Sequence, residues 1–305
     1  MSLIIVGFDE CDALLNWHDL CAAIEDWHRL PPANIQDVFL YRGADTLLSR
    51  CAWIDGLGMA VKMATVFPGN KARGETTTNG AVMLYSDRDG TLQAMIDFHL
   101  ATKWKTAADS LLAAKKLARS DSANILIVGA GAVARSMRQA YASVFPGAQF
   151  SVWSRTEKSA QSLAADYPGT AVQSDLEAAV RASDIVSCAT MSTAPLIRGS
   201  WLQPGQHIDL IGAYRPDMRE ADDEALKRAR IFVDSRETTL EHIGELKTPL
   251  ETGVISNDAV VADFYDMSAG TFCRKSSDEI TLFKNGGGAH LDLMCCRYIL
   301  DVWRN

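Results

Sequence analysis

A glycine-rich turn between an apolar run and a helical pattern constrains the fold of this chain more than any other feature. Residues 125–128 (ILIV) have the composition of a buried strand, and residues 129–134 (GAGAVA) follow directly. In such a GxGxxA turn the first glycine allows the tight strand-to-helix turn, the second lets the backbone approach a pyrophosphate, and the final alanine lets helix and strand pack closely. The N–H groups that begin the next helix then bind the anion. The alternative interpretation is that these glycines only shape the turn and bind no nucleotide. The residues predicted to contact a dinucleotide are Gly129, Gly131, Ala132 and Val133.

Strands and helices alternate around this turn. After a helical pattern come a strand at 149–153, a helix at 157–166, and further apolar runs at 184–189 and 207–213. Such alternation is typical of a parallel sheet with helices on its faces. We therefore expect an α/β nucleotide-binding domain over residues 120–287.

The N-terminal part of the chain has a different pattern. Helical spacing at 11–28 is followed, from 36 to 97, by short apolar runs separated by turn residues, which indicates an antiparallel sheet. The segment 86–90 (SDRDG) predicts a hairpin turn. A long helix is expected at about 102–119, and the chain becomes helical again from 288, where we expect it to pack on the first domain. The positions predicted to be buried in the first helix are Leu14, Leu15, Leu20, Ile24 and Trp27.

Composition argues against several classes of partner. With 30 Lys+Arg and 38 Asp+Glu the formal net charge is −8, so the basic face needed for nonspecific nucleic-acid binding is not expected. No apolar run reaches the roughly 18–20 residues that span a bilayer, and the first residues lack the pattern of a secretory signal. The seven cysteines form no CxxC pair, which argues against a metal site or a disulfide framework. We expect a cytoplasmic protein without a metal.

The residues after the second strand of the nucleotide domain discriminate between NAD and NADP. A site for NAD normally places Asp or Glu there to hold the ribose 2′-hydroxyl. Here the segment 152–156 is VWSRT, and the first acid is Glu157. Arg155 and the hydroxyl groups of Ser154 and Thr156 suit a 2′-phosphate, which a carboxylate would repel. We therefore predict NADPH as the cofactor, with NADH as the alternative; Arg155 as a solvated loop cation is the other interpretation.

Three cations of the first domain are candidates for a substrate site. Lys62 interrupts the apolar run AVKMA, where a lysine either points to solvent or meets an anion. Arg50 and Lys105 are two further cations, although helical lysines such as Lys105 usually lie on a solvated face. His290 follows a glycine-rich turn, and a structural histidine is the favoured interpretation. No Ser-His-Asp arrangement, HExxH motif or pair of carboxylates stands out.

These segments together resemble the ornithine cyclodeaminase/mu-crystallin family over nearly the whole chain, and their common order is more specific than any one motif. The resemblance implies a Rossmann-type dinucleotide-binding domain, residues 120–287, inserted into an α+β domain formed by residues 1–119 and 288–305. That α+β domain would bind substrate and join two chains in a homodimer. The matching segments are 61–62, 66–70, 102–108, 129–134, 187–193, 212–220 and 283–288.

The resemblance also implies roles for the cations. Lys62 matches the strand lysine that contacts the carboxylate of an amino or imino acid. Lys105 stands where the family usually has arginine, so the charge is kept and the two-pronged geometry is lost. The family arginine after a Pro-Pro pair is missing here after Pro31-Pro32, and Arg50 is expected to replace it in space.

Further positions are expected near the nicotinamide. Thr77 matches a threonine that lies beside it, and Thr190 and Met191 fall in the loop that covers the cofactor. Lys62, Thr77 or an ordered water are the candidates for the proton donor. True ornithine cyclodeaminases carry an aspartate in a Gly-x-Asp-x-Pro motif, where this chain has Tyr214. A tyrosine, with a pKa of about 10, is a poor general base at neutral pH.

The resemblance therefore implies an oxidoreductase that reduces C=N bonds. Its expected reaction is the NADPH-dependent reduction of a cyclic imino acid, Δ1-pyrroline-2-carboxylate to L-proline or the six-membered Δ1-piperideine-2-carboxylate. Three alternatives stay open. They are an ornithine cyclodeaminase, an alanine or N-alkyl-amino-acid dehydrogenase, and a non-catalytic NADPH-binding protein of the mu-crystallin type.

Overall fold

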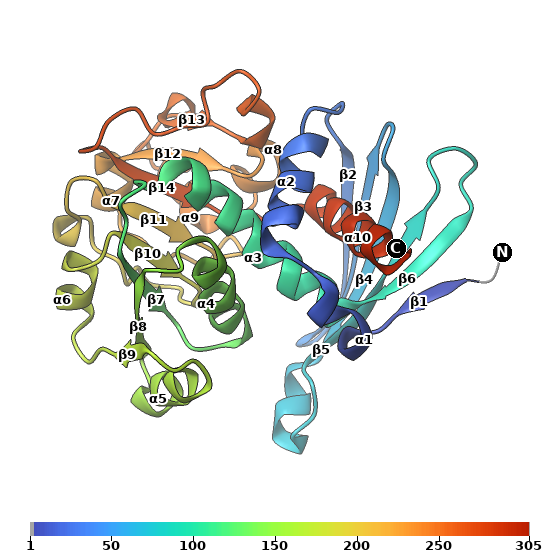
Figure 1. Ribbon diagram of the computed structural model, residues 1–305, viewed down its shortest axis with the longest axis horizontal. Coiled ribbons are helices and arrows are strands. Elements are labelled where there is room, and N and C mark those ends of the chain that lie inside the picture. Colours follow the sequence, from blue (N-terminus) through green and yellow to red (C-terminus); the bar gives the residue numbers. More distant parts are fainter. Residues whose placement is uncertain (1–2, 305) are drawn as a thin grey trace. The chain divides into compact units, whose positions relative to one another are not determined.

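The computed structural model describes residues 3–304, which form two compact units (Figure 1). The first unit consists of Met1–Lys105 and Gly287–Asn305, and the second of Thr106–Gly286. The chain passes from one unit to the other inside helix α3 (Phe98–Leu117), whereas the sequence pattern changes only at the end of this helix, near residue 119. Because the helix is continuous, no break in the sequence marks the passage.

The first unit is built on a six-stranded sheet in the order β1-β6-β5-β4-β3-β2. Strands β2 to β6 pair antiparallel, as predicted, and β1 adds to β6 in parallel. The hairpin turn predicted at 86–90 is confirmed, since the N–H of Gly90 donates to the carbonyl of Ser86. Strand β3 was not predicted, because polar residues interrupt its apolar positions. The strands are β1 (Ile4–Val6), β2 (Asn34–Arg42), β3 (Asp45–Ile54), β4 (Gly58–Val66), β5 (Thr78–Tyr85) and β6 (Leu92–Asp97).

Helices α2 (Trp17–Trp27) and α10 (Ala289–Arg304) cover one face of this sheet (Figure 1). Helix α10 contacts β3, β4 and α2, so the expected packing of the C-terminal helix on the first domain is confirmed. Along β4 the residues on this covered face are buried and the alternate residues are only half-buried. The smaller elements of this unit are α1 (Phe8–Cys11), η1 (Asp12–Leu14) and η2 (Pro68–Arg73).

One predicted core position of the first helix is wrong. Leu14 is 58% exposed, because the segment before α2 forms the short 3-10 helix η1 and not a continuation of the same helix. Asn16 caps the N-terminus of α2, since its side-chain oxygen accepts from the N–H of His18. The helical register therefore starts afresh at this cap. The other predicted positions are buried, apart from Trp27, which is half-buried.

The second unit is built on an eight-stranded parallel sheet in the order β13-β12-β14-β11-β10-β7-β8-β9. The predicted strand at 149–153 and helix at 157–166 are confirmed as β8 and α5. Between residues 214 and 287 no individual helix or strand was predicted, because helices of four to eight residues there carry little periodic signal. The strands are β7 (Asn124–Val128), β8 (Gln149–Trp153), β9 (Thr170–Val172), β10 (Ile185–Cys188), β11 (His207–Leu210), β12 (Ala229–Val233), β13 (Val260–Ala262) and β14 (Ile280–Lys284). The helical elements after α3 are α4 (Ala132–Val144), α5 (Glu157–Asp166), α6 (Leu176–Arg181), η3 (Gly199–Trp201), α7 (Asp223–Arg228), α8 (Arg236–Thr239), α9 (Gly244–Glu251), η4 (Asn257–Ala259) and η5 (Phe264–Asp266).

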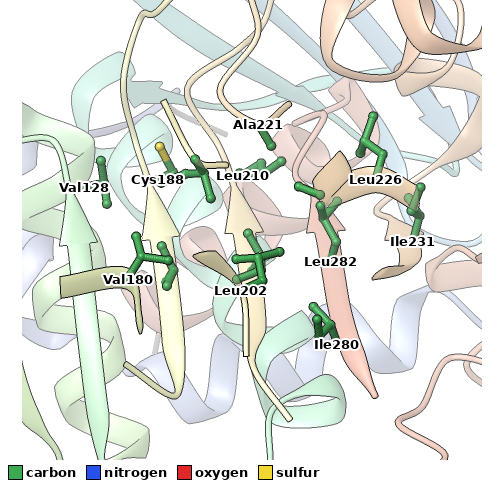
Figure 2. Packing of buried hydrophobic residues seen from close by; sticks show 14 of the residues in the cluster. Val128, Val180, Cys188, Leu202, Leu210, Ala221, Leu226, Ile231, Ile280 and Leu282 are labelled. Atoms are coloured by element: carbon green, nitrogen blue, oxygen red, sulfur yellow. The ribbon is translucent and has the colours of Figure 1, made fainter. Parts of the chain in front are cut away.

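Apolar side chains of neighbouring strands form the core on one face of this sheet. Figure 2 shows Val128, Cys188, Leu210 and Leu282, from β7, β10, β11 and β14, packed with side chains of the covering helices. Every residue of β10, β11 and β14 is buried, as is usual in parallel sheets that helices cover on both faces. Strand β7 lies between β10 and β8, so the chain continues from β7 to β8 on one side of β7 and later returns to β10 on its other side. Ligands bind outside the carboxyl ends of the strands at such a switch point.

None of the helices within residues 3–304 combines the length and the apolar composition that a bilayer crossing needs. No group of three His, Cys, Asp or Glu side chains in the same residues is placed to hold a metal ion.

Candidate active site

The glycine-rich turn has the geometry that a bound pyrophosphate needs. Gly129 has a φ of +113°, and a Cβ atom there would lie 2.6 Å from the carbonyl oxygen of Ala189, so only glycine fits. Gly131 is the N-cap of α4, and no side chain caps the first N–H groups of that helix. A Cβ at Gly131 would meet open space, which is room for a ligand. Ala134 is buried under the helix, while Ala132 is exposed and Val133 half-buried.

The predicted cofactor loop after β10 lies next to this turn. The close approach of Gly129 to Ala189 brings the two strand ends together at the switch point. Thr190 is half-buried, and its N–H and hydroxyl both donate to Oε1 of Glu220, at 2.7 and 2.8 Å. Met191 is 76% exposed. The structure thus places the predicted loop residues at the carboxyl edge of the sheet, together with the turn.

The predicted NADP-selecting residues follow β8, whose last residue, Trp153, pairs with Val128 of β7. Ser154 is half-buried, and Arg155 and Thr156 are exposed. Within residues 3–304 the guanidinium of Arg155 forms no hydrogen bond or ion pair. Thr156 is the N-cap of α5, and its side chain makes no capping hydrogen bond. A guanidinium and an uncapped helix N-terminus are therefore both available to an anion here.

In the first unit, the register of the sheet brings two predicted cations together. Arg50 of β3 and Lys62 of β4 are directly paired, so both side chains lie on the face that α10 covers. Lys62 is only 6% exposed. Its ammonium donates to Oδ1 of Asp292 at 2.9 Å and to the hydroxyl of Thr102 at 3.1 Å, and lies 4.9 Å from the ring centre of Phe98. Lys62 therefore meets an anion and does not point to solvent.

The third predicted cation joins the same group through a shared acceptor. The carbonyl oxygen of Gly287 accepts from Nη1 of Arg50 and from Nζ of Lys105, each at 2.9 Å. Arg50 also donates from Nε to Oδ2 of Asp37 at 2.9 Å. Lys105 is 6% exposed, so it is not the solvated helical lysine that its position in the sequence suggests. We call Arg50, Lys62 and Lys105 the cation cluster.

Sequence reasoning missed the carboxylate that balances this cluster. Asp292 of α10 is 1% exposed, and its Oδ2 has no hydrogen-bond partner among the described residues. Burial raises the pKa of Asp292, but the charges of Lys62, Lys105 and Arg50 outweigh it and hold that pKa below its usual value. The aspartate is therefore ionised. Its place inside the apolar run AHLDLMCC was a signal that could have found it.

The other predicted residues of this unit lie apart from the cluster or beside it. Thr77 precedes β5, whose first residue pairs with Val66, about four residues or roughly 13 Å along β4 from Lys62. No hydrogen bond in the described chain joins Thr77 to the cluster. His290 is fully buried, with its ring centre 5.4 Å from that of His28. Burial, then the charge of His28 and those of Lys105 and Arg50, lower the pKa of His290 well below its usual value, so its imidazole is neutral.

The sequence matches a known protein family over most of its length. The model of the ornithine cyclodeaminase/mu-crystallin family matches residues 54–305 of the chain. A Δ1-pyrroline-2-carboxylate reductase from Paracoccus denitrificans (strain Pd 1222) is 51% identical over 303 residues, covering 97% of this chain and 96% of the relative.

Two solved structures share the fold. The structure of Thermococcus litoralis Δ1-pyrroline-2-carboxylate reductase in complex with NADH and L-proline has a TM-score of 0.91 at 24% identity, covering 98% of this chain and 97% of that chain. An archaeal alanine dehydrogenase dimer with bound NAD has a TM-score of 0.90 at 29% identity, covering 99% and 96%. The predicted fold class, with a Rossmann-type domain inserted between the two ends of the chain, is confirmed.

Proposed function

This chain belongs to the ornithine cyclodeaminase/mu-crystallin family, and from that premise we propose that it reduces a cyclic imino acid to the cyclic amino acid with a nicotinamide nucleotide. It is an oxidoreductase acting on a C=N bond, and Δ1-pyrroline-2-carboxylate with its product L-proline is the pair that its relatives support. The observation that carries the proposal is the buried cation cluster in a chain so similar to the Paracoccus reductase. Lys62 matches the strand lysine of the family, and we expect it to contact the substrate carboxylate.

The chemistry asks little of the protein beyond binding and orientation. When bound, the reduced nicotinamide supplies a hydride to the carbon of a protonated C=N bond, which is already a strong electrophile. The chain must hold the carboxylate, orient the imine and exclude water. Lys62 uses two of its ammonium hydrogens on Asp292 and Thr102, so within the described residues one N–H is left for a ligand. That N–H is the donor we assign to the substrate carboxylate.

The cations of the cluster suit a substrate that carries a carboxylate. Arg50 is paired with Asp37 and Lys62 with Asp292. The same cations disfavour a positive iminium nitrogen beside them. The carboxylate therefore faces the cluster and the ring nitrogen points away from it.

We assign NADPH as the preferred nucleotide. The support is the free guanidinium of Arg155 beside the uncapped N-terminus of α5, at the end of β8 where NAD-dependent sites place an acid. Gly129, Gly131, Ala132 and Val133 would hold the pyrophosphate, and Ser154 and Thr156 would assist Arg155. Thr190 and Met191 would border the nicotinamide. Thr77 is assigned to the nicotinamide by family resemblance alone.

The uncovered face of the six-stranded sheet supports a homodimer. Its side chains alternate with those under α10, and on β4 they are mostly apolar and half-buried. Leu40 and Leu47 are paired on this face and are 60% and 36% exposed, and Trp53 is 48% exposed. An apolar face of this extent usually marks an interface. We assign it to a second copy of this chain.

No disulfide joins any of the seven cysteines, all of which lie within the described residues. Reduced thiols suit the cytoplasm in which we place the enzyme.

The proposal is tested by an assay panel on the purified protein. NADPH and NADH oxidation would be followed with Δ1-pyrroline-2-carboxylate, Δ1-piperideine-2-carboxylate, and pyruvate with ammonia or methylamine, and ammonia release would be measured with ornithine. We expect oxidation with the cyclic imines, fastest with NADPH, and proline as the product from the five-membered ring. Ammonia release from ornithine, turnover only with a keto acid and an amine, or tight NADPH binding without any turnover would each support one of the alternatives and contradict the proposal.

A further inference from the structure

We propose that Glu220 is a positioning residue for the nicotinamide nucleotide: its buried carboxylate fixes the two loops that follow β10 and β11. This inference rests on the proposed function, since it assumes that a dinucleotide occupies the turn at 129–134. Glu220 touches no reacting atom. Its effect is transmitted through the backbone of the loops at the carboxyl edge of the parallel sheet.

The strand-end loops at this edge are packed backbone to backbone. A Cβ atom on Gly129 would lie 2.6 Å from the carbonyl oxygen of Ala189, and one on Gly212 would lie 1.7 Å from that of Thr190. The turn after β7, the loop after β10 and the loop after β11 are therefore in contact in that order. A displacement of Thr190 reaches the pyrophosphate turn through Ala189.

Glu220 connects two of these loops with one carboxylate. Oε1 accepts from the N–H of Thr190 at 2.7 Å and from its hydroxyl at 2.8 Å. Oε2 accepts from the N–H of Gly212 at 2.6 Å and from that of Ala213 at 3.3 Å. The side chain is fully buried, and all four donors belong to the loops after β10 and β11. Four hydrogen bonds to one side chain therefore fix both loops relative to each other.

The backbone around Glu220 closes the other end of the same loop. Its carbonyl oxygen accepts from the N–H of Leu196 at 2.8 Å and from that of Ile197 at 2.9 Å. The preceding residue, Arg219, donates its N–H to the carbonyl of Ser192 at 3.1 Å. The loop from 190 to 197 is thus held at its start by the side chain of Glu220 and at its end by the backbone. Its exposed part, which includes Met191, lies between these two attachment points.

Glu220 is itself held in place by Glu245 of α9. Its N–H donates to Oε2 of Glu245 at 2.7 Å, and the N–H of Ala221 donates to Oε1 of Glu245 at 3.0 Å. Both glutamates are fully buried. Burying two carboxylates is unfavourable unless they are hydrogen-bonded, and here both accept from backbone N–H groups near the strand ends. We assign to this arrangement the role of fixing the loops at the nucleotide site.

The test measures nucleotide binding without any imine, by titrating NADPH fluorescence against the wild-type protein and Glu220→Gln. Glutamine has the same shape but only one acceptor oxygen, and its amide group faces N–H donors, so at least two of the four hydrogen bonds are lost. We expect the Kd for NADPH to rise at least about tenfold. In turnover, the KM for the nucleotide should rise by a larger factor than kcat falls.

A milder pair of variants keeps the test valid if Glu220→Gln folds poorly. Thr190→Val removes one of the four hydrogen bonds and should raise the Kd for NADPH several-fold. Thr190→Ser keeps the hydroxyl and should restore the wild-type Kd. A Kd for Thr190→Val equal to that of the wild type would overturn the inference.

The control is Asp222→Ala, two residues away. The side chain of Asp222 caps α7 and accepts from the N–H groups of Gly199 and Ala225, and it makes no hydrogen bond to Thr190, Gly212 or Ala213. Its backbone N–H, which the substitution keeps, donates to the carbonyl of Ile197 at 3.0 Å. Loss of the side chain should lower the melting temperature and leave the Kd for NADPH unchanged. A Kd for Glu220→Gln within twofold of this control means that Glu220 is only structural.

If the wild type binds neither nucleotide, the proposed function fails and the inference with it. If the Kd shifts as expected but no imine is reduced, only the substrate assignment fails.

Discussion

At the scale of single residues, the cation cluster, which we propose binds the substrate carboxylate, is stabilised by ion pairs within the chain. Buried charges are destabilising unless they are paired, and here Lys62 pairs with Asp292 while Arg50 pairs with Asp37. Lys105 donates to the carbonyl oxygen of Gly287. Because His290 is neutral, it does not add to the positive charge. These contacts stabilise the cluster without a ligand, and within the described residues Lys62 keeps one N–H for an anion.

A prediction at the same scale concerns the choice of nucleotide. Arg155→Asp replaces the free guanidinium by a carboxylate, which repels a 2′-phosphate and accepts a hydrogen bond from a ribose 2′-hydroxyl. We expect the ratio of kcat/KM for NADPH to that for NADH to fall at least about tenfold. The measurement is nucleotide oxidation with Δ1-pyrroline-2-carboxylate. Arg88→Asp, in the exposed hairpin turn of the other unit, makes the same change of charge and should leave the ratio unaltered. An unaltered ratio in Arg155→Asp would mean that this arginine is a solvated loop cation.

At the scale of elements, the second unit contains a set of buried carboxylates that link strand ends to helices. Burial, and then the charge of Glu220, raise the pKa of Glu245 in α9 to about 7, although Lys284 of β14 opposes this. Burial likewise raises the pKa of Asp209 in β11 to about 6. Each of these groups holds its proton more firmly in the folded chain than in the unfolded one. The stabilisation from each is complete below its pKa in the unfolded chain and is lost as the pH rises through its pKa in the folded chain.

This linkage predicts the effect of Glu245→Gln on stability at different pH values. The pKa of Glu245 changes from an ordinary 4.5 to about 7, so its stabilisation is present at pH 5 and lost by pH 8. The free energy of unfolding of the wild type relative to the variant should fall by about 2–3 kcal/mol over that interval. Urea unfolding of both proteins at pH 5 and pH 8 measures the difference, from which the common contribution of Asp209 cancels. A difference that does not change with pH would contradict the raised pKa of Glu245.

At the scale of the whole molecule, the two proposed binding sites lie in different units. The second unit contains the glycine-rich turn at 129–134. The first contains the cation cluster under α10 and the largely apolar outer face of its sheet. Helices cover only one face of this sheet among residues 3–304, whereas the parallel sheet is buried on both. We propose that two copies of this chain pair through this exposed apolar face.

The corresponding prediction is an effect on assembly. Leu47→Lys places a charge on the outer face, where burial against a second copy would leave it unpaired. We expect the wild type to sediment as a dimer and Leu47→Lys as a monomer at the same micromolar concentration. Leu14→Lys, which changes an equally apolar exposed residue outside the sheet, should remain dimeric. A monomeric wild type, or a dimeric Leu47→Lys, would place the interface elsewhere or remove it.

The sequence predicted the parts of this molecule that have a local signal. The turn at 129–134, the strand at 149–153 and the helix at 157–166 each carry a short-range pattern, and the structure has all three. The cations were recognisable one by one, but their meeting depends on the β3–β4 register and on Gly287, far along the chain. Asp292 and Glu220 were missed because their partners are 230 and 30 residues away. Contacts at such separations leave no periodicity in a single sequence.

The most direct test of the account is the steady-state kinetics of Lys62→Met with Δ1-pyrroline-2-carboxylate and NADPH. Methionine preserves the length of the side chain and removes its charge, so the carboxylate loses its closest donor. We predict that kcat/KM falls at least about a hundredfold, or roughly 2.7 kcal/mol of transition-state binding, while the Kd for NADPH is unchanged. Lys227→Met, which removes an exposed lysine from α7, should behave as the wild type. Near-normal kinetics in Lys62→Met would show that the cation cluster does not bind the substrate and would contradict the account.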